Sequence, residues 1–113
     1  MISEPHPDVR LLLERMVTRM GDRPILPDRP TPAQLRSLDV LLVEPAAPAG
    51  AILAQLARAA SPSLAIVCES VTAPSPELAQ LVDFAAVLVK PFTLEQLEQA
   101  MEPVLRPAMA SAA

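Results

Sequence analysis

Val87-Leu88-Val89-Lys90-Pro91-Phe92 is an apolar run that contains the only lysine of this 113-residue chain. The chain has nine Lys and Arg residues, and every one except Lys90 is arginine. A lysine ammonium is a compact point charge on a flexible stem, whereas an arginine guanidinium is a planar fork, so the two are not interchangeable. The run predicts a buried strand over 84–89, and Lys90 places a point charge where that strand ends.

Other apolar segments predict further strands, with helical patterns between them. The continuous apolar runs 40–43 and 64–68 are typical of strands buried on both faces. Shorter strands are expected at 1–3 and 24–26. Helices are predicted after each strand, at about 8–20, 31–38, 51–61, 75–82 and 93–105. Strict alternation of strand and helix predicts the α/β class, with a parallel sheet covered by helices on both faces.

Composition limits the classes of protein to which the chain can belong. Its 113 residues suffice for one domain, expected at 1–106, with a flexible tail at 107–113. The net charge of −4 and the pI of about 4.8 argue against nucleic-acid binding. No run reaches the roughly 18 apolar residues of a membrane span, and no signal peptide is expected. The single cysteine, Cys68, allows no internal disulfide. These features predict a cytoplasmic protein.

Chemistry-bearing residues follow four of the predicted strands. Glu4, Glu44 and Lys90 each come just after a strand, and the segment 68–70 ends another. In parallel α/β sheets, ligands bind outside the carboxyl ends of the strands. We therefore expect two acids, the thiol of Cys68 or a hydroxyl, and the lysine to converge at one edge of the sheet.

Several stretches of the chain, taken together, resemble the receiver domain of bacterial response regulators. They are 87–92 followed by 93–97, 39–44 with Pro48 four residues on, and 7–10 at the start of the first predicted helix. The resemblance implies a flavodoxin-like (CheY-like) three-layer sandwich with a five-stranded parallel sheet in the order 2-1-3-4-5. It also implies a cis peptide bond between Lys90 and Pro91.

The family's site has a defined pattern, which this chain matches only in part. In the family, a histidine kinase donates a phosphoryl group to an aspartate, and Mg²⁺ is held by that aspartate and an acidic pair. A Thr or Ser and a Lys contact the phosphoryl group. By resemblance, Lys90 and Pro91 match the pattern, and Glu4 matches the first acid of the pair. Glu44 stands in place of the phosphoacceptor aspartate, and Cys68 in place of the Thr or Ser.

The departures from this pattern predict a site that phosphorylation does not switch. Pro5 replaces the second acid of the pair, so Mg²⁺ binding is expected to be weak at most, and no metal or other cofactor is assigned. Val87 replaces the switch aromatic and has no ring to move. The side chain of Glu44 is one methylene longer than aspartate and can reach Lys90 without a phosphate. We therefore expect a degenerate, pseudo-receiver domain.

The expected function is a stand-alone signal-transduction module that binds another protein and is not an enzyme. The expected partner is a protein such as a histidine kinase, or a second copy bound through the face formed by 76–105, and neither nucleic acid nor a membrane. One alternative is a phosphorelay response regulator that uses Glu44 as its phosphoacceptor. Another is a small enzyme that uses Glu44, Cys68 and Lys90. No pair of nucleophile and base supports the enzyme, and Cys68 is expected to be a small core residue.

The first strand poses a difficulty for the implied topology. In the order 2-1-3-4-5 this strand is interior, but only residues 1–3 are available to form it. A short interior strand leaves backbone groups of its neighbours unpaired, which is costly. We therefore expect either that the true gene starts upstream of residue 1 or that the domain is marginal at this strand.

Overall fold

The computed structural model describes residues 1–26 and 29–105, so the expected tail at 107–113 lies outside the described residues. The middle layer is a parallel sheet of four strands, β1 (Ile2–Ser3), β2 (Val40–Val43), β3 (Ala65–Ser70) and β4 (Ala86–Val89). Their order in the sheet is their order in the chain, β1-β2-β3-β4. Parallel neighbours need long crossover connections, and the helices lie in these connections.

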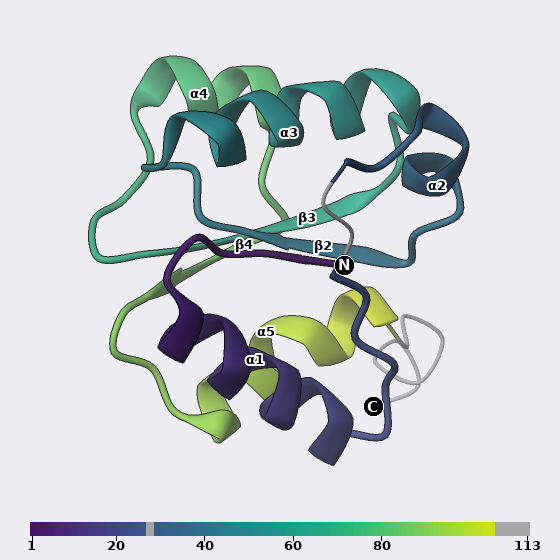
Figure 1. Ribbon diagram of the computed structural model, residues 1–113. Coiled ribbons are helices and arrows are strands. Elements are labelled where there is room, and N and C mark those ends of the chain that lie inside the picture. Colours follow the sequence, from purple (N-terminus) through teal and green to yellow (C-terminus); the bar gives the residue numbers. More distant parts are fainter. Residues whose placement is uncertain (27–28, 106–113) are drawn as a thin grey trace.

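Helices cover both faces of the sheet (Figure 1). α1 (Pro7–Arg19) and α5 (Leu94–Leu105) lie on one face. α2 (Pro32–Arg36), α3 (Pro48–Ala60) and α4 (Pro76–Val82) lie on the other. This arrangement confirms the predicted α/β class and the three-layer architecture. None of the described helices is both long enough and apolar enough to cross a membrane.

The strand predicted at 24–26 does not form, so the prediction of five strands in the order 2-1-3-4-5 is wrong. One backbone hydrogen bond joins this segment to the sheet, from the Ile2 amide to the Ile25 carbonyl at 2.9 Å. Pro24 and Pro27 flank its two apolar residues, and a proline has no amide hydrogen with which to continue a ladder. β1 is therefore an edge strand, which removes the difficulty of a very short interior one.

Alternation along the strands divides the apolar side chains between two cores. The core toward α1 and α5 includes Leu13, Val17, Leu42, Val67, Leu97 and Met101. The core toward α3 and α4 includes Leu41, Val43, Ala54, Ala57, Ile66 and Val82. Neighbours such as Leu41 and Leu42 belong to different cores because successive side chains of a strand point to opposite faces. The same alternation decides which residues of β3 reach the site.

Capping residues begin three of the helices where the sequence predicts them. Thr31 and Gln34 form a reciprocal capping box at the start of α2. Thr93 and Gln96 exchange the same pair of hydrogen bonds before α5, at 2.9 and 3.1 Å. The Ser75 side chain caps the start of α4. These bonds satisfy amides that the first turn of a helix leaves unpaired.

β3 is longer than predicted. The sequence pattern ends this strand at Cys68, whereas the structure extends it to Ser70, because β3 pairs with β4 as far as Val89. Residues 69 and 70 therefore keep the alternation of a strand, which places the Glu69 side chain on the same face as Val67.

β4 is shorter than predicted and is buried on one face only. It begins at Ala86 instead of residue 84, and it forms the edge of the sheet opposite β1. Leu88 belongs to the core toward α1 and α5, but Val87 and Val89 on the other side are 45% and 55% exposed. The prediction of a strand buried on both faces is wrong here, because α4 ends at Val82 and leaves these valines uncovered.

Candidate functional site

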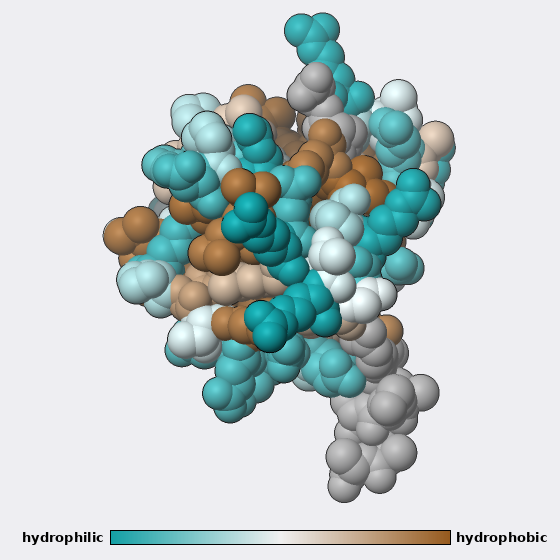
Figure 2. All heavy atoms as spheres, turned by 60° about the horizontal axis from the view of Figure 1, so that its bottom comes forward, coloured by the Kyte–Doolittle hydropathy of each residue, from teal (hydrophilic) through white to brown (hydrophobic). Residues whose placement is uncertain are grey.

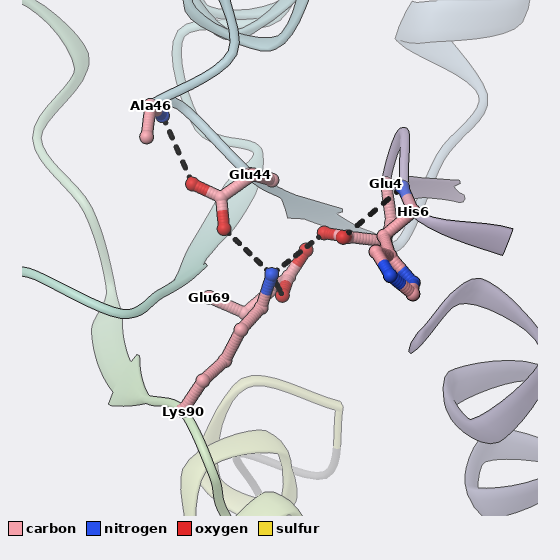
Figure 3. Close-up of polar contacts among 6 residues, drawn as sticks. All are labelled: Glu4, His6, Glu44, Ala46, Glu69 and Lys90. Atoms are coloured by element: carbon pink, nitrogen blue, oxygen red, sulfur yellow. Dashed lines mark hydrogen bonds and ion pairs between the residues drawn. The ribbon is translucent and has the colours of Figure 1, made fainter. Parts of the chain in front are cut away.

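Lys90 lies at the carboxyl end of β4. Its backbone amide donates a hydrogen bond to the Ser70 carbonyl at 2.8 Å, which joins the end of β4 to the end of β3. The peptide bond between Lys90 and Pro91 is cis, as the resemblance implies. The Lys90 side chain extends from β4 toward residues at the ends of β1 and β2 (Figure 3).

The Lys90 ammonium lies among three buried carboxylates. Its Nζ is 3.0 Å from Glu4 Oε2, 2.7 Å from Glu44 Oε2 and 3.0 Å from Glu69 Oε2. The Lys90 side chain is 15% exposed, and the glutamate side chains are 2%, 8% and 0% exposed, respectively. We call these four residues the carboxyl-edge cluster. The expected ion pair between Glu44 and Lys90 is confirmed, and it belongs to a larger group that draws on all four strands.

Local backbone geometry orients two of the carboxylates. Glu44 Oε1 accepts a hydrogen bond from the Ala46 amide at 3.0 Å, and Glu4 Oε1 accepts one from the His6 amide at 3.3 Å. Each carboxylate thus caps the loop after its own strand and turns its other oxygen toward Lys90 (Figure 3). Both predicted acids therefore lie where the sequence analysis expects them, at the same edge as the lysine.

The start of α3 packs closely against this edge. A Cβ atom at Gly50 would overlap the carbonyl oxygen of Glu44. Glycine therefore lets the first turn of α3 approach the end of β2, where it buries the backbone of Glu44.

Glu69 is the cluster residue that sequence reasoning missed. The predicted strand ends at Cys68, which leaves the orientation of residue 69 undefined. In the structure, Glu69 pairs in register with Leu88 and faces α1 and α5. An acid directly after an apolar run, at the edge where Glu4 and Lys90 were already expected, is the signal that identifies it. Reading that signal requires the true end of β3, which depends on pairing with β4.

The surplus of carboxylates over ammonium groups shifts the protonation equilibria of the cluster. Burial raises the pKa of Glu69 to about 9, and the neighbouring carboxyl group of Glu4 adds to this shift. Burial also acts to raise the pKa of Glu4, but the neighbouring Glu69 and Lys90 side chains outweigh it, so that pKa is lowered. Burial acts to lower the pKa of Lys90, yet its bonds with Glu44, Glu4 and Glu69 outweigh it and raise that pKa. Lys90 is therefore a permanent cation.

Two of the predicted site residues lie apart from the Lys90 ammonium. Cys68 is fully buried, and as the neighbour of Glu69 in β3 it points to the opposite face of the sheet. Burial raises the pKa of the Cys68 thiol to about 11, and the charges of Glu44 and Glu69 add to the shift. Such a thiol is a poor nucleophile. Val87 pairs in register with Cys68 and is exposed on β4.

The three glutamates have the chemistry of a divalent-cation site but do not fit one here. Their ligand oxygens lie within 4.8 Å of one another, and Mg²⁺ prefers carboxylate oxygens. The Lys90 ammonium, however, lies among these oxygens and contacts one from each glutamate. Mg²⁺ demands near-ideal octahedral geometry and keeps several waters, so it would have to displace the ammonium. In this arrangement, Lys90 is the cation that the carboxylates bind.

Several solved structures of similar fold are response regulators or receiver domains. The chemotaxis protein CheY4 of Vibrio cholerae has a TM-score of 0.77 and 20% identity, over 92% of this chain and 95% of that chain. The receiver domain of sensor histidine kinase PA1611 from Pseudomonas aeruginosa has a TM-score of 0.74 and 21% identity, over 92% and 93%. A response regulator from Thermotoga maritima has a TM-score of 0.70 and 16% identity, over 93% and 94%. The fold is that of CheY-like receiver domains.

The sequence itself matches no protein-family model and no curated protein. At 16–21% identity, the structural likeness establishes the fold and not the chemistry. The PA1611 receiver domain was solved with a magnesium ion coordinated in its active site cleft. In this chain an ammonium lies among three glutamates at the carboxyl edge of the sheet. Its function must therefore be argued from its own residues.

Proposed function

We propose that this chain is a receiver-like signalling module that phosphorylation does not switch and that acts by binding another protein. The observation that carries the proposal is the contact of one ammonium, Lys90, with Glu4, Glu44 and Glu69. In the receiver pattern, the lysine contacts the phosphoryl group. Here three carboxylates already satisfy the lysine, so a phosphoryl group would have to break these pairs and enter a region with surplus negative charge.

The state of Glu44 gives further support. By resemblance, it stands at the phosphoacceptor position, but its two oxygens accept hydrogen bonds from Lys90 and the Ala46 amide. A carboxylate held in this way is a weak nucleophile for phosphoryl transfer. The thiol of Cys68, which takes the place of the Thr or Ser by resemblance, faces away from Lys90. The cluster therefore resembles a receiver site in which the protein's own carboxyl groups occupy the contacts that a phosphoryl group would make.

The test is incubation with acetyl phosphate and Mg²⁺, followed at once by intact-mass spectrometry. We expect no gain of a phosphoryl group, while a competent receiver domain treated in parallel gains one. A phosphoryl adduct on the wild-type chain that disappears in Glu44→Gln would overturn the proposal. That result would establish the alternative, a response regulator that uses a glutamate phosphoacceptor.

The face around β4 is the surface we propose for the protein partner. Val71, Leu81, Val87 and Val89 lie on or beside β3, α4 and β4 and are 68%, 64%, 45% and 55% exposed. Exposed aliphatic patches often mark a contact surface, and Val87 and Val89 share the outer face of β4. Most of these residues lie within 76–105, the segment for which a homodimer is expected by resemblance.

The layer of α1 and α5 provides a control for this surface. Figure 2 shows that the molecule, viewed from the side of this layer, mixes hydrophilic side chains with hydrophobic ones. Leu12 on α1 is 49% exposed, close to the exposure of Val87 and Val89. Substitution of Leu12 therefore tests whether any exposed aliphatic residue contributes to partner binding, or only the residues around β4.

Sedimentation velocity over a range of concentrations tests the homodimer. We expect Val87→Asp combined with Val89→Asp to shift a wild-type dimer to monomer, and Leu12→Asp to leave it unchanged. A wild-type chain that sediments as a monomer at every concentration excludes the homodimer. The partner is then a different protein, to be sought by capture on the wild-type chain with the double variant as the control.

A further inference from the structure

The carboxyl-edge cluster contains more acidic groups than its one cation can neutralise. Three carboxyl groups surround Lys90 Nζ at 2.7–3.0 Å, and each is at most 8% exposed. If all three were ionised, the cluster would carry two uncompensated negative charges away from water. Uncompensated buried charge is strongly unfavourable, and groups in such a position usually take up a proton instead.

The hydrogen bonds of the cluster indicate which carboxyl group carries that proton. Glu4 and Glu44 each accept a backbone N–H bond in addition to the contact with Lys90, so both of their carboxyl oxygens have a donor. Glu69 has a fully buried side chain, and neither of its oxygens accepts a hydrogen bond from a protein donor within the described residues. Among the described residues, a single cation contacts it, Lys90, whose Nζ lies 3.0 Å from Glu69 Oε2. Glu69 is therefore the group for which ionisation is least favourable.

The groups around Glu69 come from every element at this edge. Glu4 follows β1, Glu44 follows β2 and Lys90 follows β4, and Cys68 precedes it on β3 and faces the other side of the sheet. α5 packs against β3 through apolar residues such as Leu97. Arg10 of α1 lies beside Glu4 at a surface pocket, but no ion pair joins it to the cluster. No second cation in the described part of the chain thus neutralises Glu69.

We propose that Glu69 is a neutral carboxylic acid in the folded protein, that it donates its proton in a hydrogen bond to Glu4, and that its ionisation loosens the carboxyl edge of the sheet. This proton is separate from the proposed signalling function and does not depend on it. It makes the stability of the edge sensitive to pH, because the ionised form would repel Glu4 without gaining a partner.

The direction of the pH effect follows from the pKa of Glu69, which is raised to about 9 by burial and by Glu4. Between the ordinary pKa of 4.5 and about 9, the folded chain retains a proton that the unfolded chain has released. The contribution of Glu69 to stability is therefore complete below pH 4.5, falls as the pH rises, and is lost above about pH 9. One retained proton raises the unfolding equilibrium constant up to about tenfold per pH unit.

NMR of the wild-type protein labelled with ¹³C at its glutamate carboxyl carbons tests the protonation directly. We expect one glutamate resonance at the protonated position at pH 7, titrating only at alkaline pH, and absent in Glu69→Gln. If all the glutamate carboxyl resonances of the folded wild-type protein titrate at acidic pH, the proposal is overturned. This measurement stands even if a variant fails to fold.

Urea unfolding at several pH values provides the second test. Glu69→Gln keeps the charge and shape of a neutral acid, so it should equal or exceed the wild type in stability at pH 7 and show a shallower dependence on pH. Glu44→Gln removes the acceptor that lies 2.7 Å from Lys90 Nζ, so it should lose stability and keep the wild-type slope. Glu98→Gln, on the exposed side of α5, is the surface control. Loss of stability in Glu69→Gln with an unchanged slope would place the proton elsewhere and refute the assignment.

Discussion

Lys90 and Arg58 each join several segments of this domain, but they do so with different acceptors. Lys90 contacts the carboxyl groups of three glutamates at the carboxyl edge of the sheet. Within the described part of the chain, the acceptors of Arg58 on α3 are backbone carbonyls, at 2.6–3.1 Å. Its acceptors are the carbonyls of Pro62, Leu64, Val82 and Asp83. The guanidinium thus ties the end of α3 to the start of β3 and to the end of α4.

The two sets of acceptors differ in whether their interaction with the cation depends on pH. Backbone carbonyls do not titrate, so the bonds of Arg58 keep the same strength over the whole pH range. Lys90 contacts three acids with a single positive charge. The net charge of the cluster therefore depends on pH and on any ion that binds there. The planar fork of arginine suits carbonyls spread over three segments, whereas a compact ammonium fits among three converging carboxylates. This explains physically why the chain has a lysine at residue 90.

Replacing Lys90 should have the largest effect on stability. In Lys90→Met the carboxylates remain buried without their cation, and breaking a buried pair in this way costs about 3–5 kcal/mol. Urea unfolding at pH 7 measures the loss, with Glu98→Gln as the surface control. A loss below about 1 kcal/mol is the value typical of exposed pairs, and it would show that water already screens the cluster.

Replacing Arg58 should reduce the stability of the fold by less than replacing Lys90. Arg58→Lys keeps the charge, but one ammonium cannot reach all four carbonyls at once, so we expect a loss of about 2 kcal/mol. The pH dependence of unfolding should stay that of the wild type, because no acid is involved. A changed pH profile in this variant would contradict the distinction between the two cations.

Removing the charge of Glu4 should give a smaller loss of stability, and the size of this loss should depend on pH. The pKa of Glu4 is lowered on balance: burial acts to raise it, but Glu69 and Lys90 outweigh that effect. Its ionised form therefore stabilises the fold fully above pH 4.5, and the contribution is lost as the pH falls through the lowered pKa. Glu4→Gln should be less stable than the wild type by about 1 kcal/mol at pH 7 and approach it at pH 3. Urea unfolding at the two pH values measures this difference. An equal loss of stability in Glu4→Gln at pH 7 and at pH 3 would refute the expectation.

Substitutions on the outer face of β4 should affect stability least. Val87 and Val89 are both about half exposed, and neither belongs to a core cluster. Val87→Thr and Val89→Thr keep the β-branched shape, so each should change stability by less than about 0.5 kcal/mol. A larger loss in unfolding measurements on dilute protein would show that these valines support the cluster through β4.

Much of the fold could be predicted from the sequence because local signals agree with the tertiary structure. Buried runs such as 40–43 and capping residues such as Thr93 act within a few residues, so their outcome needs no distant partner. The predicted strand at 24–26 failed for a reason that is also local, since flanking prolines remove the amides a ladder needs. The site was predicted in part: Glu4, Glu44 and Lys90 meet as expected, because parallel strands bring their carboxyl ends to one edge.

What the sequence by itself determined is the class of fold, the edge at which charged residues gather, and the single lysine that lies there. The tertiary structure alone decided that β3 continues to Ser70, that Glu69 turns toward Lys90 and that Cys68 turns away from it. The physical reason is that the length of a strand depends on its pairing with a neighbour, and the two further residue pairs of β3 and β4 decide which side chains face the site. The balance of charge around Lys90 follows from that pairing and not from any motif.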